Sequence, residues 1–138
     1  KFLMVNISGL DIDIVKNKIK IIESIINCRE IVLQVGFQAY PTPIEYSGLG
    51  KINKLKSVFN NKIIYADHTS GEEEDSFLLP ILGVHAGAHG IEKHIMLSDE
   101  ETKYDSEASI TLEQLSTYTK MFENRKVFVG NLSFLTII

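Results

Sequence analysis

The sequence contains a single cysteine, Cys28, among 138 residues. No disulfide bond can therefore form within the chain, which is typical of proteins in a reducing cytoplasm. The chain has no apolar run of the roughly 18 residues that a membrane-spanning helix needs. Its first residues also lack the long apolar core of a signal peptide. The formal net charge is only −4, so no general basic field favours nucleic acid as a partner.

The composition that remains is that of an ordinary globular protein, with 44% hydrophobic and 23% charged residues. A chain of this length fits one compact domain. The sequence begins with Lys1 and passes at once into a strand-like apolar run. We therefore expect it to be a piece of a longer protein.

Four short apolar runs alternate with four helical patterns along the chain. The predicted strands are residues 2–6, 31–35, 63–65 and 90–93. The predicted helices are residues 11–27, residues 48–59, a segment that ends near residue 86, and a segment that begins after residue 111. Strict alternation predicts an α/β fold with a parallel sheet. Four such units make either half of a (β/α)8 TIM barrel or a small doubly wound sheet.

The helices show apolar positions three and four residues apart, which predicts one buried face on each. The predicted buried residues are Ile12, Val15, Ile19, Ile22 and Ile26, then Leu49, Ile52, Leu55 and Val58 or Phe59, and finally Leu112, Leu115, Thr119 and Phe122. Thr111 and Gln114 are spaced as a capping box for the last helix. The first strand is apolar throughout, which predicts cover on both faces. Residues 124–138 have no clear period and stay unplaced, either as an extra strand or as a segment that packs on something absent.

Two histidines and an aspartate follow the predicted third and fourth strands. His68 follows one apolar run, His94 ends another, and Asp105 lies eleven residues further on. The carboxyl ends of neighbouring parallel strands open on the same rim, where α/β proteins build their sites. Two imidazoles and a carboxylate on that rim can hold a divalent cation.

Other polar residues have simpler interpretations. His85 and His89 lie on or just after a helix, and we expect them to be structural or exposed. The acidic run 72–75 is expected to be a solvated helix start. Cys28 has no histidine near it in sequence, and a buried, inert thiol is the default. Glu92 shares a strand face with His94 and is equally compatible with a site role and with a lysine partner, whereas Lys93 points the other way and is expected to be structural.

Five short motifs resemble, in order, the second half of the catalytic barrel of the N-acetylneuraminate (sialic acid) synthase family. They are Ser8-Gly9, Tyr40-Pro41-Thr42-Pro43, Asp67-His68-Thr69, Ile91-Glu92-Lys93-His94, and Asp105 with Ala108-Ser109. Each motif alone is weak, but five in order at compatible spacing are specific. The resemblance covers roughly residues 1–123, and the tail beyond has no counterpart.

The resemblance implies an enzyme that condenses phosphoenolpyruvate with an N-acetylated sugar aldehyde such as N-acetylmannosamine, giving a nine-carbon 2-keto acid and phosphate. It implies His68 and His94 as ligands of Mn²⁺ or Mg²⁺, with Asp105 as a further catalytic residue. Tyr40 and Asp105 would contact the sugar, and Gln38 and Ser8 would bind phosphoenolpyruvate. It also implies a cytoplasmic transferase of carbohydrate biosynthesis that is a homodimer when complete.

Three residues depart from the family pattern. Ala66 replaces a serine, Ile7-Ser8-Gly9 replaces Ser-Thr-Gly, and Ser106 replaces a histidine. These changes bear on phosphate binding more than on metal binding. The chain also lacks the first four barrel strands and the family's C-terminal domain, so we expect the isolated chain to be inactive and prone to associate through open sheet edges. A degenerate, non-catalytic module that binds a sugar or a partner chain is one alternative, and an unrelated doubly wound domain with chance motifs is another.

Overall fold

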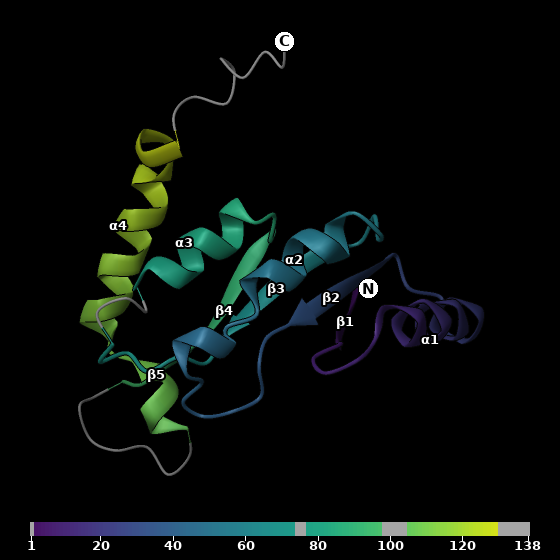
Figure 1. Cartoon of the computed structure of the whole chain (residues 1–138), viewed down its shortest axis with the longest axis horizontal. Helices are drawn as coiled ribbons and strands as arrows, with labels where there is room; N and C mark the ends of the chain where they lie inside the picture. The colour runs from purple at the N-terminus through teal and green to yellow at the C-terminus, as the bar shows by residue number, and fades with distance from the viewer. Residues whose placement is uncertain (1, 74–76, 98–104, 130–138) are drawn as a thin grey trace.

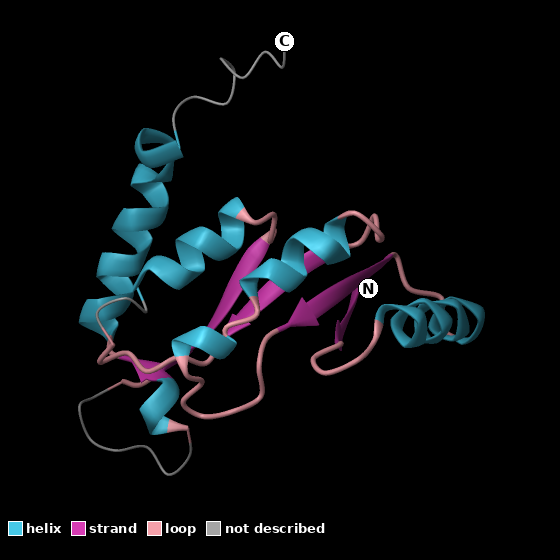
Figure 2. Cartoon of the chain, viewed as in Figure 1, coloured by secondary structure: helices cyan, strands magenta, loops and turns pink. Residues whose placement is uncertain are grey.

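The computed structural model describes residues 2–73, 77–97 and 105–129, with side chains up to residue 123. Five parallel strands form one sheet in the order in which they occur along the chain. They are β1 (Phe2–Asn6), β2 (Glu30–Val35), β3 (Lys62–Asp67), β4 (Gly90–Ile95) and β5 (Ser109–Ile110). The strands are magenta in Figure 2.

Four α-helices connect or follow the strands: α1 (Ile12–Ile25), α2 (Leu49–Lys56), α3 (Leu78–His85) and α4 (Leu112–Val129). Two short 3-10 turns, Ile44–Tyr46 and Ser106–Ala108, lie in the loops. In Figure 1, α2 and α3 lie in front of the sheet, while α1 and α4 stand at its two sides. None of the helices within the described ranges is long and apolar enough to cross a membrane.

The strand order decides between the two predicted architectures. In a doubly wound sheet the order reverses at a switch point, because the chain returns to the middle of the sheet. Here each new strand is added at the same edge, from β1 to β5. The α/β fold with parallel strands is thus confirmed, and the sequential order is that of a segment of a (β/α)8 barrel.

The core lies between one face of the sheet and the helices. Leu33 and Ile63 point from β2 and β3 toward Val15 of α1 and toward Ile52 and Leu55 of α2, and all five are at most 1% exposed. Each such side chain contributes about 1.5–3 kcal/mol when it is fully buried. The predicted stripes of α1 and α2 are confirmed, except that α1 ends at Ile25 and leaves Ile26 half exposed.

Three predictions about the strands and helices are wrong in detail. The sheet has a fifth strand, because Ser109 and Ile110 pair with His94 and Ile95; two residues are too few to show a period. β1 is not covered on both faces, since Phe2 is 70% exposed on the face opposite the helices.

The third error concerns α4, which buries Tyr118 rather than Leu112 and Thr119. The Tyr118 ring packs against Phe77, with ring centroids 4.8 Å apart, so one large aromatic decides which face turns inward. The predicted capping box is confirmed: Gln114 accepts a hydrogen bond from the Thr111 amide (2.8 Å) and Thr111 accepts one from the Gln114 amide (3.2 Å). The helix continues to Val129, and the rest of the tail lies outside the described residues.

The ends of β2 and β3 approach so closely that only glycine fits between them. A Cβ atom on Gly36 would lie 2.2 Å from the carbonyl oxygen of Ala66. We predict that Gly36→Ala lowers the free energy of unfolding by about 1–3 kcal/mol, the usual cost of overpacking. Gly50→Ala on α2 is the matched control, because its Cβ would meet nothing within 4 Å. The control should be neutral or stabilising by up to about 1 kcal/mol. Urea unfolding of the wild type and the two variants measures both changes in free energy. A Gly36→Ala variant as stable as the wild type would contradict the close approach of β2 to β3.

Candidate metal and substrate site

Three side chains converge at the carboxyl ends of β3 and β4. His68 directly follows β3, and Glu92 and His94 lie two residues apart on one face of β4. Each offers one ligand atom, and these atoms all lie within 4.8 Å of one another. Glu92 Oε1 is 4.0 Å from His68 Nε2, and the two imidazole centroids are 5.2 Å apart. The expectation that both histidines meet on one rim is therefore confirmed.

The backbone around His68 holds its ring in one orientation. The side chain is buried, and its Nδ1 lies 2.9 Å from the carbonyl oxygen of Phe37. A carbonyl oxygen can only accept, so Nδ1 carries the proton and Nε2 of the neutral ring keeps its lone pair. The amide of Thr42 also donates to the carbonyl oxygen of His68 at 2.7 Å. This tautomer would leave the Nε2 lone pair available to a cation.

The loop after β2 supplies the wall of the site. Its Thr42 hydroxyl lies 3.2 Å from the Phe37 carbonyl oxygen and 2.8 Å from that of Ala39, which closes the loop on itself. The Tyr40–Pro41 peptide bond is cis. The Tyr40 ring lies against both imidazoles, with centroids 4.5 Å from His68 and 5.5 Å from His94. The buried threonine of the Tyr-Pro-Thr-Pro motif therefore places the tyrosine over the two histidines.

Asp105 completes the group from the side of β5. Its Oδ2 lies 3.7 Å from Nδ1 of His94. The residue adopts a left-handed conformation (φ 56°), and the Ser109 hydroxyl donates to its carbonyl oxygen at 2.8 Å. A carboxylate beside the ring nitrogen that faces away from a metal is a common way to orient a histidine ligand.

Glu92 is the member of the group whose role the sequence left open. Its Oε2 accepts a hydrogen bond from Gln34 on β2, across β3, while its Oε1 faces His68. Ala66 is the register partner of Glu92, and its small side chain leaves room for this contact over β3. The sequence does not predict that Gln34 contacts Glu92, because one glutamine in an apolar strand says nothing about its hydrogen-bond partner.

The site is electrostatically acidic, as Tyr40 shows. Burial raises the pKa of the Tyr40 phenol above its ordinary value, and the negative charges of Asp105 and Glu92 raise it further. On the opposite face of the sheet, burial lowers the pKa of Lys93, whereas Asp67 acts in the other direction. The rim therefore presents carboxylates and a protonated phenol to anything that binds there.

Of the two residues predicted to bind phosphoenolpyruvate, one lies beside the histidines and the other lies at the ends of β1 and β2. Gln38 is exposed and accepts a hydrogen bond from the Tyr40 hydroxyl at 3.2 Å, next to the histidines. Ser8 uses its hydroxyl to accept a hydrogen bond from the Gly36 amide at 3.1 Å, at the ends of β1 and β2. The structure thus brings His68, His94, Tyr40 and Gln38 together with Asp105 and ties Ser8 to the backbone. Their catalytic and binding roles stay predictions.

Most residues with simpler interpretations behave as expected where the structure describes them, and Cys28 is the exception. His85 is exposed, and His89 accepts a hydrogen bond from the Ile63 amide at 3.1 Å. Glu72 and Glu73 are exposed, and the rest of their acidic run lies outside the described residues. Cys28 is half-buried rather than buried.

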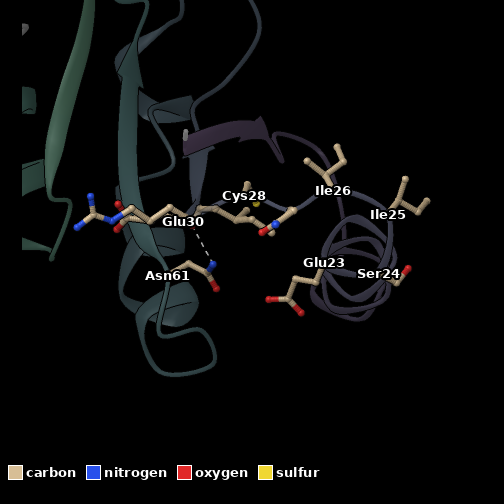
Figure 3. Close-up of a pocket in the computed structure, with 10 residues that line it drawn as sticks. Glu23, Ser24, Ile25, Ile26, Cys28, Glu30 and Asn61 are labelled. Atoms are coloured by element: carbon tan, nitrogen blue, oxygen red, sulfur yellow. Dashed lines mark hydrogen bonds between the residues drawn. The ribbon is translucent and has the colours of Figure 1, made fainter.

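Two of the cavities within the described residues lie at opposite ends of the sheet. Figure 3 shows one of about 430 Å³ at the amino end of β2, lined by Cys28 and Glu30, where Asn61 donates to the Ile31 carbonyl oxygen. The other, of about 570 Å³, lies on the histidine rim. Its lining includes Pro41 and Ser106, which follow Tyr40 and Asp105 in the chain. Ser109, the register partner of His94, also lines it, but none of the side chains of the histidine site does.

Comparisons with known proteins agree with this geometry. Residues 9–133 match the sequence model of the NeuB family. The chain is 40% identical over 93 residues to a pseudaminic acid synthase of Campylobacter jejuni, and 30% identical over 105 residues to a pseudaminic acid synthase of Helicobacter pylori. These matches cover 67% and 76% of this chain but only 26% and 29% of the relatives, so the chain spans about a quarter of their length.

The fold comparison points the same way. The crystal structure of an N-acetylneuraminic acid (sialic acid) synthetase from Leptospira borgpetersenii, in complex with citrate, superposes with a TM-score of 0.79. It is 23% identical in sequence, and the match covers 94% of this chain and 43% of that protein. That likeness shows the shared barrel-type fold, and the family match over most of the sequence shows descent: the chain belongs to the NeuB family.

Proposed function

We propose that this protein, in its full length, is a metal-dependent synthase that condenses phosphoenolpyruvate with an N-acetylated amino-sugar aldehyde. The product would be a nine-carbon 2-keto sugar acid, with phosphate released. The observation that supports the proposal most is the convergence of His68, Glu92 and His94 beneath Tyr40 in a member of the NeuB family. Because the chain spans about a quarter of its relatives, the complete reaction belongs to the longer protein. The homodimer and the cytoplasmic location implied by the resemblance stay predictions.

The donor set fits a divalent cation. His68 Nε2, an imidazole nitrogen of His94 and a Glu92 oxygen need only small side-chain adjustments to reach the roughly 2.0–2.2 Å of metal–ligand bonds. Two nitrogen donors favour Mn²⁺ over Mg²⁺, which prefers oxygen ligands and retained water. When bound, the cation would polarise the aldehyde oxygen of the sugar as a Lewis acid.

The surrounding residues would recognise the sugar. Asp105 can accept hydrogen bonds from sugar hydroxyls, and the Tyr40 phenol, whose pKa is raised above its ordinary value, is protonated at neutral pH. The cavity at the same end of the sheet has a volume within the usual range of small-ligand pockets. Its lining contains hydroxyl groups from Ser70, Ser106, Ser109 and Thr111, which suit a polyhydroxylated ligand.

A second candidate function is a non-catalytic module that binds the cation and a sugar but not phosphoenolpyruvate. It is supported by Ala66, which lacks the hydroxyl of the family's serine, and by Ser8, whose hydroxyl is already bonded to Gly36. Phosphate release from phosphoenolpyruvate and N-acetylated sugars, measured on the full-length protein, separates the two. Release favours the synthase, and sugar binding without release favours the module.

The metal site can be tested on the full-length protein, with residues numbered as in this sequence. We predict that His68→Ala or His94→Ala weakens Mn²⁺ binding by more than about 100-fold, because changes around a ligand already cost 10–100-fold. The matched control is His85→Ala, an exposed histidine on α3, which should leave the affinity unchanged. Isothermal titration calorimetry with MnCl2 measures the affinity of all three variants. If His68→Ala and His94→Ala bind Mn²⁺ as tightly as the wild type, the proposed metal centre is wrong.

Tyr40 provides an independent optical test. Since nearby carboxylates raise its pKa, Asp105→Asn should lower it, and a cation bound beside the ring should lower it as well, because positive charge stabilises the phenolate. Ultraviolet difference titration measures tyrosine ionisation, and the absorbance change that is lost in Tyr40→Phe belongs to Tyr40. A Tyr40 pKa that does not respond to saturating Mn²⁺ would place the cation elsewhere.

A further inference from the structure

A buried ion pair lies directly behind the histidine pair, on the opposite face of the sheet. Asp67 is fully buried and the Lys93 side chain is 6% exposed, with Lys93 Nζ 3.2 Å from Asp67 Oδ2. That oxygen accepts no hydrogen bond from the described residues, so the ammonium charge is what offsets its burial. None of the proposed chemistry uses either group.

The register connects this pair to both ligands. Asp67 and Lys93 are direct partners in the parallel pairing of β3 with β4. Each immediately precedes a histidine of the site, His68 or His94. Side chains alternate along a strand, so the ion pair points toward the helices while the histidines point to the other face. The pair therefore sets how the two ligand-bearing backbones lie relative to each other.

Thr69 extends the network to the far side of His68. Its amide and its hydroxyl donate to Asp67 Oδ1 at 3.0 and 2.6 Å. Its carbonyl oxygen accepts a hydrogen bond from Lys93 Nζ. Both neighbours of His68 are thus bound to one ammonium group carried by the strand of His94.

We infer that Asp67, Lys93 and Thr69 are positioning residues that hold His68 and His94 at cation-binding separation. A buried ion pair is weak as a source of stability, because apolar residues of similar volume often serve as well. What it supplies is one defined geometry, since the charge pair and its hydrogen bonds are satisfied at one strand register only. The inference rests on the proposed metal site, and it accounts for the polar residues that flank the histidines in the two motifs.

The test separates positioning from simple stability. Lys93→Met leaves the buried Asp67 carboxylate without its counter-charge, so we expect the melting temperature to fall by roughly 10–20 °C. The double variant Asp67→Asn/Lys93→Met removes both charges and keeps an acceptor for Thr69, so most of the melting temperature should return. Its Mn²⁺ affinity should nevertheless stay at least about 10-fold below wild type, as when other ligand-orienting groups are removed.

A matched control uses the exposed pair of Glu30 and Lys62, which are 3.0 Å apart on β2 and β3 at the other end of the sheet. Glu30→Gln/Lys62→Met should leave Mn²⁺ affinity unchanged. A readout without metal is the set of nuclear Overhauser contacts from the Tyr40 ring to both imidazoles. These contacts should be present in the wild type and in the control, and weakened in the Asp67/Lys93 double variant.

The outcomes are distinguishable. If the wild-type full-length protein binds no Mn²⁺, the proposed function fails, while the Tyr40 contacts still report on positioning. If the Asp67/Lys93 double variant recovers both stability and wild-type affinity with its Tyr40 contacts intact, the pair is structural only and the inference is overturned.

Discussion

The contact between Asp67 and Lys93 is the constraint on which the rest of the rim depends. Two parallel strands can slide or splay at their carboxyl ends, where the hydrogen-bonded ladder stops. Here a buried charge pair joins them one residue before each histidine. Removing one partner of such a pair costs roughly 3–5 kcal/mol, so the register of β3 and β4 is not easily lost. The arrangement of His68 and His94 on one face therefore follows from electrostatics on the other.

Small residues at the rim allow the strands to come as close as the site requires. Gly36 lies against the Ala66 backbone, where no Cβ fits, and Ala66 in turn leaves space for Gln34 to reach Glu92 over β3. Three strands thus contribute to a single carboxylate orientation. A larger residue at position 36 or 66 would act on the site through the strand spacing, without touching a histidine.

Much of the fold was predictable, because apolar periodicity reports directly on burial. The stripe of α1 and the two histidines at strand ends came from such patterns. β5 is not predictable from the sequence, because two residues are too few to show a period. The buried face of α4 is not the predicted one, because the large Tyr118 ring is buried in place of the smaller residues of the expected stripe. Glu92 was left undecided because a single acidic residue in a strand equally fits a surface partner. The pairing of Asp67 with Lys93 depends on strand register, which no local pattern in the sequence states.

The candidate site is built from neighbouring strands and the loops beside them. His68, Glu92, His94, Tyr40 and Asp105 all come from β3, β4 and the segments beside them, and their mutual contacts lie within the described residues. The face of the sheet that carries Glu92 is open, with Glu92 38% exposed and Phe2 uncovered on β1. The side chains that would hold the proposed cation therefore all lie within this segment. The proposed condensation would need an enclosure that excludes water, and this open face does not supply one.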